Sequence, residues 1–157
     1  MQNYRLRSLL PFALLGGIAG GLAEVIWVML YASLTSLDAS VVAHAIATTF
    51  ISTPLDDRLL VMLGIVIHFA LSIGLAAAFT YAMADWLSRE TLIAAAVAAL
   101  ATVWTVNFLV LLPVANPSFV SLLPASVSLT SKLLFGLAMG GTMLRLSYRE
   151  RQPAPLF

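Results

Sequence analysis

Four long apolar stretches occupy most of this chain, and they constrain its fold more than any other feature. They cover approximately residues 9–33, 59–84, 92–113 and 124–146. An α-helix of about 20 apolar residues is long enough to cross the hydrocarbon core of a bilayer. Only 10% of the residues are charged, whereas a soluble domain has about 25%. The sequence therefore predicts an all-α integral membrane protein, in which residues 1–157 form a single four-helix bundle within the lipid bilayer.

The first stretch also has features of a cleaved signal peptide. Arg5 and Arg7 precede it, and Ala19 or Ala23 could stand before a cleavage site. The apolar run continues to Tyr31, however, and the hydrophobic region of a signal peptide has only about 7–15 residues. We therefore expect a true membrane span.

Basic residues near the ends of the stretches predict the orientation in the membrane. Cytoplasmic loops of membrane proteins carry an excess of Lys and Arg. Six basic residues fall on one side of the four stretches, and Arg58 falls on the other side together with three aspartates. We therefore expect an N-in/C-in topology, in which segments 34–58 and 113–124 face outward and 147–157 is a cytoplasmic tail. The six residues are Arg5, Arg7, Arg89, Arg145, Arg149 and Arg151.

The first outer segment, 34–58, contains a short amphipathic pattern. Residues 38–50 are compatible with a helix whose apolar side chains share one side, and Asp38 near its start suits the positive end of the helix dipole. We expect this helix to lie on the outer interface of the membrane. The second outer segment, 113–124, is uncharged, apolar and contains three prolines, which suits a segment that dips back toward the lipid or binds a partner. The alternative for both segments is an ordinary connection.

Each apolar stretch contains one strongly polar residue, and we call these four residues the polar layer: Glu24, His68, Asn107 and Lys132. Counted from the outer ends of the stretches at about 1.5 Å per residue, all four lie about 9–14 Å below the outer boundary. Polar side chains are costly inside a bilayer, so they mark either functional sites or helix contacts. One interpretation is a ligand-binding pocket in the outer half of the bundle. The other is that each residue only bonds a neighbouring helix.

The chemistry of the polar layer suits several ligands. Glu24 and Lys132 can form a buried ion pair, which is less costly than either charge alone, and His68 can titrate near neutrality. Trp27 and Trp104 either form apolar walls for a ligand or anchor the spans at the interface. Candidate ligands are a quinone, a lipid, a small amphipathic acid or a proton-coupled solute. The candidate ligand-binding residues are Glu24, Trp27, His68, Trp104, Asn107 and Lys132.

Glycines gather in the half of the bundle near the chain termini. Gly17 and Gly20 in the first stretch, and Gly136 and Gly140 in the fourth, recur at spacings of three or four, so each pair lies on one helix face. Small residues allow helices to approach closely. We expect these four glycines to pack the first and fourth helices together, which leaves the outer half wider. The alternative is that they form the face of a homodimer.

Other classes of function find no support in the sequence. The absence of cysteine excludes disulfides, thiolate chemistry and cysteine-ligated metals. We see no nucleotide-binding loop, zinc-protease helix or serine-hydrolase motif, and the net charge of +1 gives no sign of nucleic-acid binding. The spacing of His44 and His68 does not argue for a metal or haem. We therefore predict no catalytic residue, metal or cofactor. The remaining enzymatic alternative uses Glu24, His68 or Lys132 as acid or base.

Three short stretches resemble a known group of proteins. They are Gly-Gly-Ile-Ala-Gly-Gly-Leu-Ala-Glu-Val-Ile-Trp over residues 16–27, Gly-Ile-Val-Ile-His-Phe-Ala-Leu-Ser over 64–72, and Leu112-Pro113 with Asn116-Pro117. In these stretches the chain resembles the small uncharacterised bacterial inner-membrane proteins typified by YagU, which implies a bacterial inner-membrane location. Those proteins tend to carry further histidines and acidic residues in the last two spans. This chain has Asn107 and Lys132 there, so a shared chemistry does not follow.

Two function classes follow from these patterns. In the first, the polar layer binds a small molecule or ion, as a component of transport or as a site for a lipophilic ligand. In the second, the protein is a non-catalytic accessory or assembly subunit, in a homo-oligomer or a larger membrane complex, and its polar residues contact partner helices. A ligand site requires the polar residues to point to a common interior, whereas contacts to partners face outward on different sides.

Overall fold

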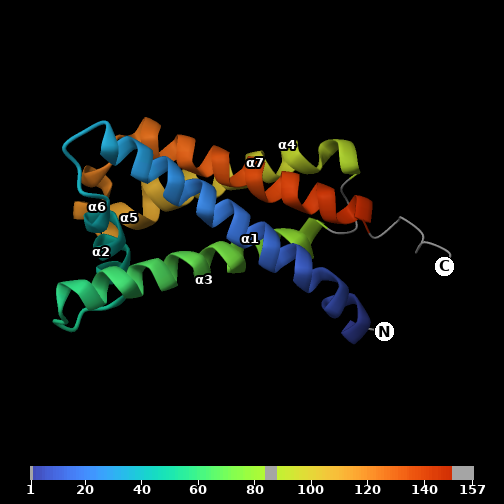
Figure 1. The fold of residues 1–157 in the computed structure, drawn as a ribbon, viewed down its shortest axis with the longest axis horizontal. Helices are drawn as coiled ribbons and strands as arrows, with labels where there is room; N and C mark the ends of the chain where they lie inside the picture. Colours follow the sequence, from blue (N-terminus) through green and yellow to red (C-terminus); the bar gives the residue numbers. More distant parts are fainter. Residues whose placement is uncertain (1, 84–87, 150–157) are drawn as a thin grey trace.

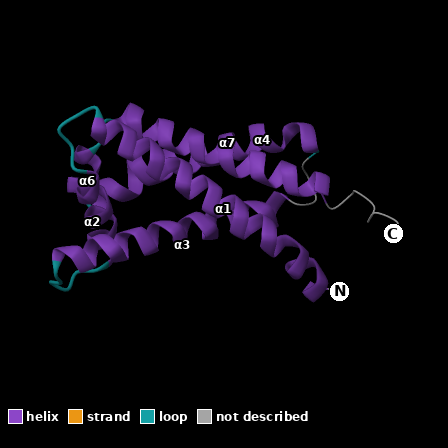
Figure 2. Ribbon diagram, in the orientation of Figure 1, coloured by secondary structure: helices purple, strands orange, loops and turns teal. Residues whose placement is uncertain are grey.

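The computed structural model describes residues 2–83 and 88–149, and every regular element in these ranges is a helix (Figure 2). The all-α prediction is confirmed for this part of the chain. Residues 150–157 of the predicted tail lie outside the described residues. The elements are α1 (Gln2–Ser33), α2 (Ala39–Phe50), α3 (Asp57–Met83), α4 (Arg89–Val106), the π-helical turn η1 (Asn107–Leu111), α5 (Leu112–Ala115), α6 (Pro117–Leu122) and α7 (Ala125–Arg149).

Four of the described helices are long and apolar enough to cross a membrane: Leu9–Ser33, Asp57–Met83, Glu90–Ala115 and Ala125–Leu146. They match the four stretches predicted from the sequence to within a few residues. Large apolar side chains on their outer faces stay uncovered by the protein, including Ile26, Met62 and Val66, each about two-thirds exposed at 64%, 65% and 64%. Such a surface is suited to lipid, where exposed apolar groups cost nothing.

The four long helices pack side by side in the order α3, α1, α7, α4, because α1 contacts both α3 and α7, and α7 contacts both α1 and α4. The apolar core lies in the half that contains the chain termini (Figure 1). There, Phe79 from α3, Leu100 from α4 and Met139 from α7 meet in one buried cluster, with Phe12 of α1 packed against it. The opposite half of the molecule contains the polar side chains of the candidate site.

The glycines set the distances between neighbouring helices, but only Gly20 does so between the two helices that we predicted. An added Cβ at Gly17 would lie 2.6 Å from Cα of Ile73 in α3, and one at Gly136 would lie 2.7 Å from Cα of Val97 in α4. Gly140 likewise faces α4, and only Gly20 faces α7. The expectation that all four glycines join the first and fourth helices is therefore wrong. The spacing shows which glycines share a helix face, but not which neighbour covers that face.

The same contacts argue against the alternative that these glycines form the face of a homodimer. Because Gly17, Gly136 and Gly140 are covered by helices of the same chain, they are not free to form a face between two copies. Gly74 and Gly141, by contrast, have no atom within 4 Å of an added Cβ.

The connections at the end away from the termini form a cap of three short helices, α2, α5 and α6 (Figure 1). The predicted helix over 38–50 is confirmed as α2, and Asp38 is its N-cap, accepting a hydrogen bond of 2.9 Å from the amide of Ser40. This backbone bond, with a smaller contribution from the Ser40 side chain, holds the pKa of Asp38 below its ordinary value of 3.8. A side chain at Gly64 of α3 would overlap the carbonyl of Ala43, so that glycine allows α2 to cross α3.

Asn116 fastens the two outer connections to each other. Its side-chain oxygen accepts from the amide of Phe119 and caps α6, while its side-chain nitrogen donates to the carbonyl of Ala45 at 3.2 Å and to the hydroxyl of Thr49 at 3.0 Å in α2. The segment 113–124 is therefore not a simple connection. One asparagine satisfies backbone groups in two helices that are far apart in sequence.

The π-helical turn η1 lies just before Pro113. Proline has no N–H and its ring crowds the carbonyl four residues earlier, here that of Leu109. The backbone responds by widening, and the amide of Leu112 bonds to the carbonyl of Asn107 five residues back. The helical path can then continue through Pro113 to Ala115. The sequence analysis had ended this stretch at Pro113.

Candidate functional site

The centre of the candidate site is an ion pair between Glu24 of α1 and Lys132 of α7. Nζ of Lys132 lies 2.7 Å from Oε1 of Glu24 and 2.9 Å from Oε2, to which it donates a hydrogen bond. The Glu24 side chain is 5% exposed and that of Lys132 is 21% exposed. The predicted contact between these two residues is confirmed. A charge pair at this position is costly to desolvate, and each partner needs the other.

The packing below the pair explains why the two side chains meet. Gly20 lies one turn before Glu24 on α1, and an added Cβ there would be 2.7 Å from the ring of Phe135. Phe135 is fully buried and lies about one turn after Lys132 on α7. The ring fills the space that the glycine leaves, so α1 and α7 come close at this level. Lys132 also sits over this ring, with Nζ 5.8 Å from its centroid.

Ser131 completes the coordination of Glu24, and the sequence analysis missed it. Its hydroxyl lies 3.1 Å from Oε1 of Glu24 and 2.8 Å from the carbonyl of Ser128. Ser131 is buried, at 7% exposure. It directly precedes Lys132 in the chain, so the turn of α7 that presents the ammonium also presents the hydroxyl. Serine is too common in membrane helices for this position to have been recognised without the structure.

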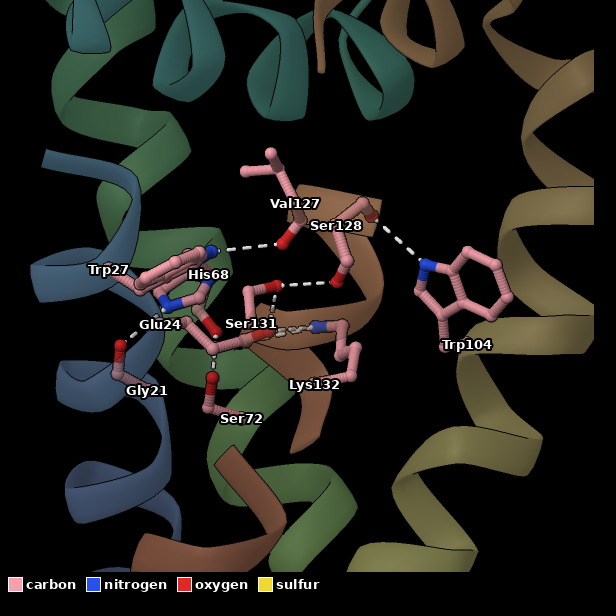
Figure 3. A network of polar contacts seen from close by, with 10 residues as sticks. All are labelled: Gly21, Glu24, Trp27, His68, Ser72, Trp104, Val127, Ser128, Ser131 and Lys132. Carbon is pink, nitrogen blue, oxygen red and sulfur yellow. Dashed lines mark hydrogen bonds and ion pairs between the residues drawn. The ribbon is translucent and has the colours of Figure 1, made fainter. Parts of the chain in front are cut away.

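His68 joins α3 to α1 just below the ion pair. Its Nε2 lies 3.1 Å from the carbonyl of Gly21, and its own carbonyl accepts a hydrogen bond of 2.8 Å from Ser72 (Figure 3). Gly21 is one turn before Glu24 on α1. The structure therefore places His68 at the edge of the site, bonded to the backbone of α1. Among the described residues, His68 makes no hydrogen bond to Glu24 or Lys132, so it does not bridge them.

Both predicted tryptophans bond to the first turns of α7. Nε1 of Trp27 donates to the carbonyl of Val127 at 3.0 Å, and Nε1 of Trp104 donates to the hydroxyl of Ser128 at 3.0 Å (Figure 3). Trp104 also stacks on Phe108, with ring centroids 5.2 Å apart and planes 14° apart. Indoles that anchor a span at the interface turn their N–H groups to water and head groups. These two turn theirs to the protein, on the outward side of the ion pair.

Asn107 lies apart from the other three members of the polar layer. Its side chain is half-buried, and the described part of the chain offers it no hydrogen bond. The contacts of Gly136 with Val97 and of Gly140 with Ile93 set the register of α7 against α4. In this register Lys132 lies opposite residue 101, and Asn107 is six residues, about 9 Å, further out. The predicted common depth fails here because α6 returns the chain inward before α7 begins.

A second titratable pair lies in the cap. Nε2 of His44 in α2 is 3.4 Å from Oδ1 of Asp57 at the start of α3, and Asp57 is 91% exposed. An exposed pair of this kind contributes little to stability. Within the described residues, no three His, Cys, Asp or Glu side chains gather in a way that could hold a metal ion.

These contacts define what the site can do chemically. Two opposite charges from two neighbouring spans lie in contact, a hydroxyl bonds to the carboxylate, and two indoles bond to α7 about one turn outward of the pair. Comparison with known protein families, curated proteins and solved structures gave no match. The function is therefore argued from the geometry of the site alone.

Proposed function

We propose that this chain is a multi-pass membrane protein that binds a small amphipathic molecule or ion at the Glu24–Lys132 pair, as a component of transport or as a site for a lipophilic ligand. The observation that carries the proposal is the direction of the polar side chains. Glu24 and Lys132 come from two helices and turn toward each other inside the protein, and His68 of a third helix bonds to the backbone of α1 one turn before Glu24. Contacts to partner helices would face outward.

The ammonium of Lys132 supports a binding role more than a purely structural one. It has three donors, and among the described residues its acceptors are the two carboxylate oxygens of Glu24. At least one donor is thus left for another molecule. Lys132 is also the more exposed partner, at 21% against 5% for Glu24. Trp27 and Trp104, which bond to α7 about one turn outward of Lys132, provide flat apolar surfaces for the rest of a ligand.

The proposal includes the setting of the site. Both termini are cytoplasmic, the cap of α2, α5 and α6 lies on the outer interface, and the membrane is the inner membrane of a bacterium. The excess of basic residues on the terminal side supports the orientation. A cytoplasmic reporter fused after Phe157 should be active, and a reporter that works only in the periplasm should be silent. The reverse result would contradict the topology.

The alternative function is an accessory subunit of a larger membrane complex. One observation favours it: every buried side-chain nitrogen or oxygen among the described residues already has a hydrogen-bond partner. A layer that is complete in the free protein can serve as a helix contact alone.

Purification in a mild detergent separates the two functions. Mass spectrometry would compare the molecules that co-purify with the wild type, with the double variant Glu24→Gln/Lys132→Met, and with Arg58→Met. The last variant removes an exposed cation outside the layer and is the control. We expect the wild type and the control to retain a small molecule that the folded double variant loses. If the double variant retains everything that the wild type does, the polar layer is structural.

A further inference from the structure

The Glu24–Lys132 pair is electrically neutral, and this limits which ligands it can accept. Within the described spans, these two residues are the charged side chains that lie away from the helix ends. No charged side chain of α4 reaches the pair, and α3 contributes only His68, which bonds to the carbonyl of Gly21. An anion that binds Lys132 while Glu24 stays ionised would leave a net negative charge in an apolar environment. Such a state is strongly disfavoured.

A proton on Glu24 removes this obstacle. With Glu24 neutral, Lys132 and a bound monovalent anion again sum to zero charge. One proton is therefore taken up from solvent for each anion that binds, and no other group need change its charge. Because the coupling is a property of equilibrium binding, it works in both directions: a lower pH favours the anion, and the anion favours the proton.

Ser131 is placed to serve both protonation states of Glu24. It has a single hydroxyl proton, but two acceptors lie within reach: Oε1 of Glu24 at 3.1 Å and the carbonyl of Ser128 at 2.8 Å. While Glu24 is ionised, the hydroxyl donates to the carboxylate. When Glu24 is protonated, its O–H donates to Oγ of Ser131, and the serine proton turns to the carbonyl of Ser128. The Ser131 hydroxyl therefore keeps both an acceptor for its own proton and a hydrogen bond to Glu24 in either state.

We propose, on the basis of the function proposed above, that Lys132 binds the carboxylate of a small acid with an apolar body, and that Glu24 takes up one proton as it releases Lys132. Phe135 holds the ammonium through its ring face after the release. Trp104 and Trp27 contact the apolar body. An aromatic acid from the aqueous side and a fatty acid from the bilayer share this chemistry.

Titration calorimetry on the purified protein in detergent tests the proposal, with benzoate and decanoate as the two probes. Benzamide, which has the same ring and no charge, is the control ligand. Between about pH 6 and pH 8, where simple carboxylic acids are ionised, we expect binding to weaken by up to about tenfold per pH unit, the limit for one linked proton. Repeating the titration in buffers of different ionisation enthalpy counts the protons directly, and we expect about one proton per bound acid. Benzamide should not bind.

Three variants assign the coupling to its residues. Glu24→Gln should bind the acid with no proton uptake and no dependence on pH. Lys132→Met should lose binding, and His68→Gln should keep the wild-type pH dependence. Binding of benzoate or decanoate to the wild type without proton uptake, or equal binding by Lys132→Met, would overturn the inference. The proton count uses the wild type, so it decides the question even where a variant does not fold.

Failure of this inference is distinguishable from failure of the proposed function. If neither acid binds, but a neutral or cationic molecule co-purifies with the wild type and not with the Glu24→Gln/Lys132→Met variant, the site binds ligands and the anion assignment is wrong. If no acid binds and no molecule depends on the pair, both proposals are wrong. Preference for benzoate over decanoate identifies an aqueous source, and the opposite preference identifies the bilayer. Either preference supports the carboxylate assignment.

Discussion

Removing one partner of the Glu24–Lys132 pair should destabilise the protein far more than removing both. Lys132→Met leaves a carboxylate that is 5% exposed, with only the hydroxyl of Ser131 as a described side-chain donor. Stranding a buried charge in this way costs about 3–5 kcal/mol. Glu24→Gln leaves an ammonium that is 21% exposed and retains an amide oxygen as acceptor, so we expect a loss near the lower end of that range. The double variant replaces both charges with neutral groups of similar size and should be nearly as stable as the wild type.

The assay is unfolding in detergent micelles, with the free energy of unfolding of the four proteins arranged as a double-mutant cycle. We expect a coupling energy of about 3 kcal/mol or more, whereas independent sites add to within about 0.5 kcal/mol. The loss of unfolding free energy in Lys132→Met should become smaller as the pH falls, because a protonated Glu24 carries no charge and does not need a cation as its partner. Additive single losses would refute the reasoning, since they would mean that the contact of 2.7 Å contributes nothing to the fold.

Further predictions concern the helix contacts and the cap. Gly136→Leu should lower the thermal stability strongly, because its side chain would enter the backbone of α4. Gly74→Leu is the control, since an added Cβ there meets no atom within 4 Å, and it should leave the thermal stability nearly unchanged. Equal losses in the two variants would contradict the packing. Asn116→Leu should raise the rate of amide hydrogen exchange in both α2 and α6. A change in only one of the two helices would argue against the role of Asn116 in joining them. Because the pKa of Asp38 is lowered in the folded state, its cap stabilises α2 fully above the unfolded pKa and is lost as the pH falls through the folded pKa. Asp38→Ala should abolish this acid dependence of exchange in α2, and an unchanged profile would show that the cap is not its cause.

Hydropathy and spacing were sufficient to predict the long helices and the central ion pair. Apolar runs of this length directly indicate helices that can span a bilayer. A charged residue inside such a run needs a partner of opposite charge. Glu24 and Lys132 could be paired from the sequence for the same reason: each is the one charged residue in the interior of its stretch. The N-cap of α2 at Asp38 was also predictable, since a side-chain acceptor before a helix is a local signal.

Features that depend on the neighbour of a helix could not be predicted. Gly136 shows that a helix approaches closely, but it carries no information on whether that helix is α1 or α4. Asn107 lies further out than Lys132 because the chain runs back inward through α6 before α7 begins. The length of this inward step is not visible in any periodicity of the sequence. The hydroxyl of Ser131 became meaningful only when Glu24 of another helix was found 3.1 Å away.

The central claim is that the region beside Lys132 is open to molecules from outside, and cysteine accessibility measures this most directly. The chain contains no cysteine, so Ser128→Cys creates a single thiol one turn outward of Lys132. The thiolate is the form that attacks thiol reagents, and it forms where water reaches the sulfur. Val66→Cys is the matched control, since the packing of Gly17 on Ile73 places Val66 at the level of Glu24, while its side chain is 64% exposed on the apolar surface. We predict that a water-soluble reagent added from outside labels Ser128→Cys well above Val66→Cys, and that benzoate slows the labelling. Labelling of Ser128→Cys no faster than that of Val66→Cys would contradict the account.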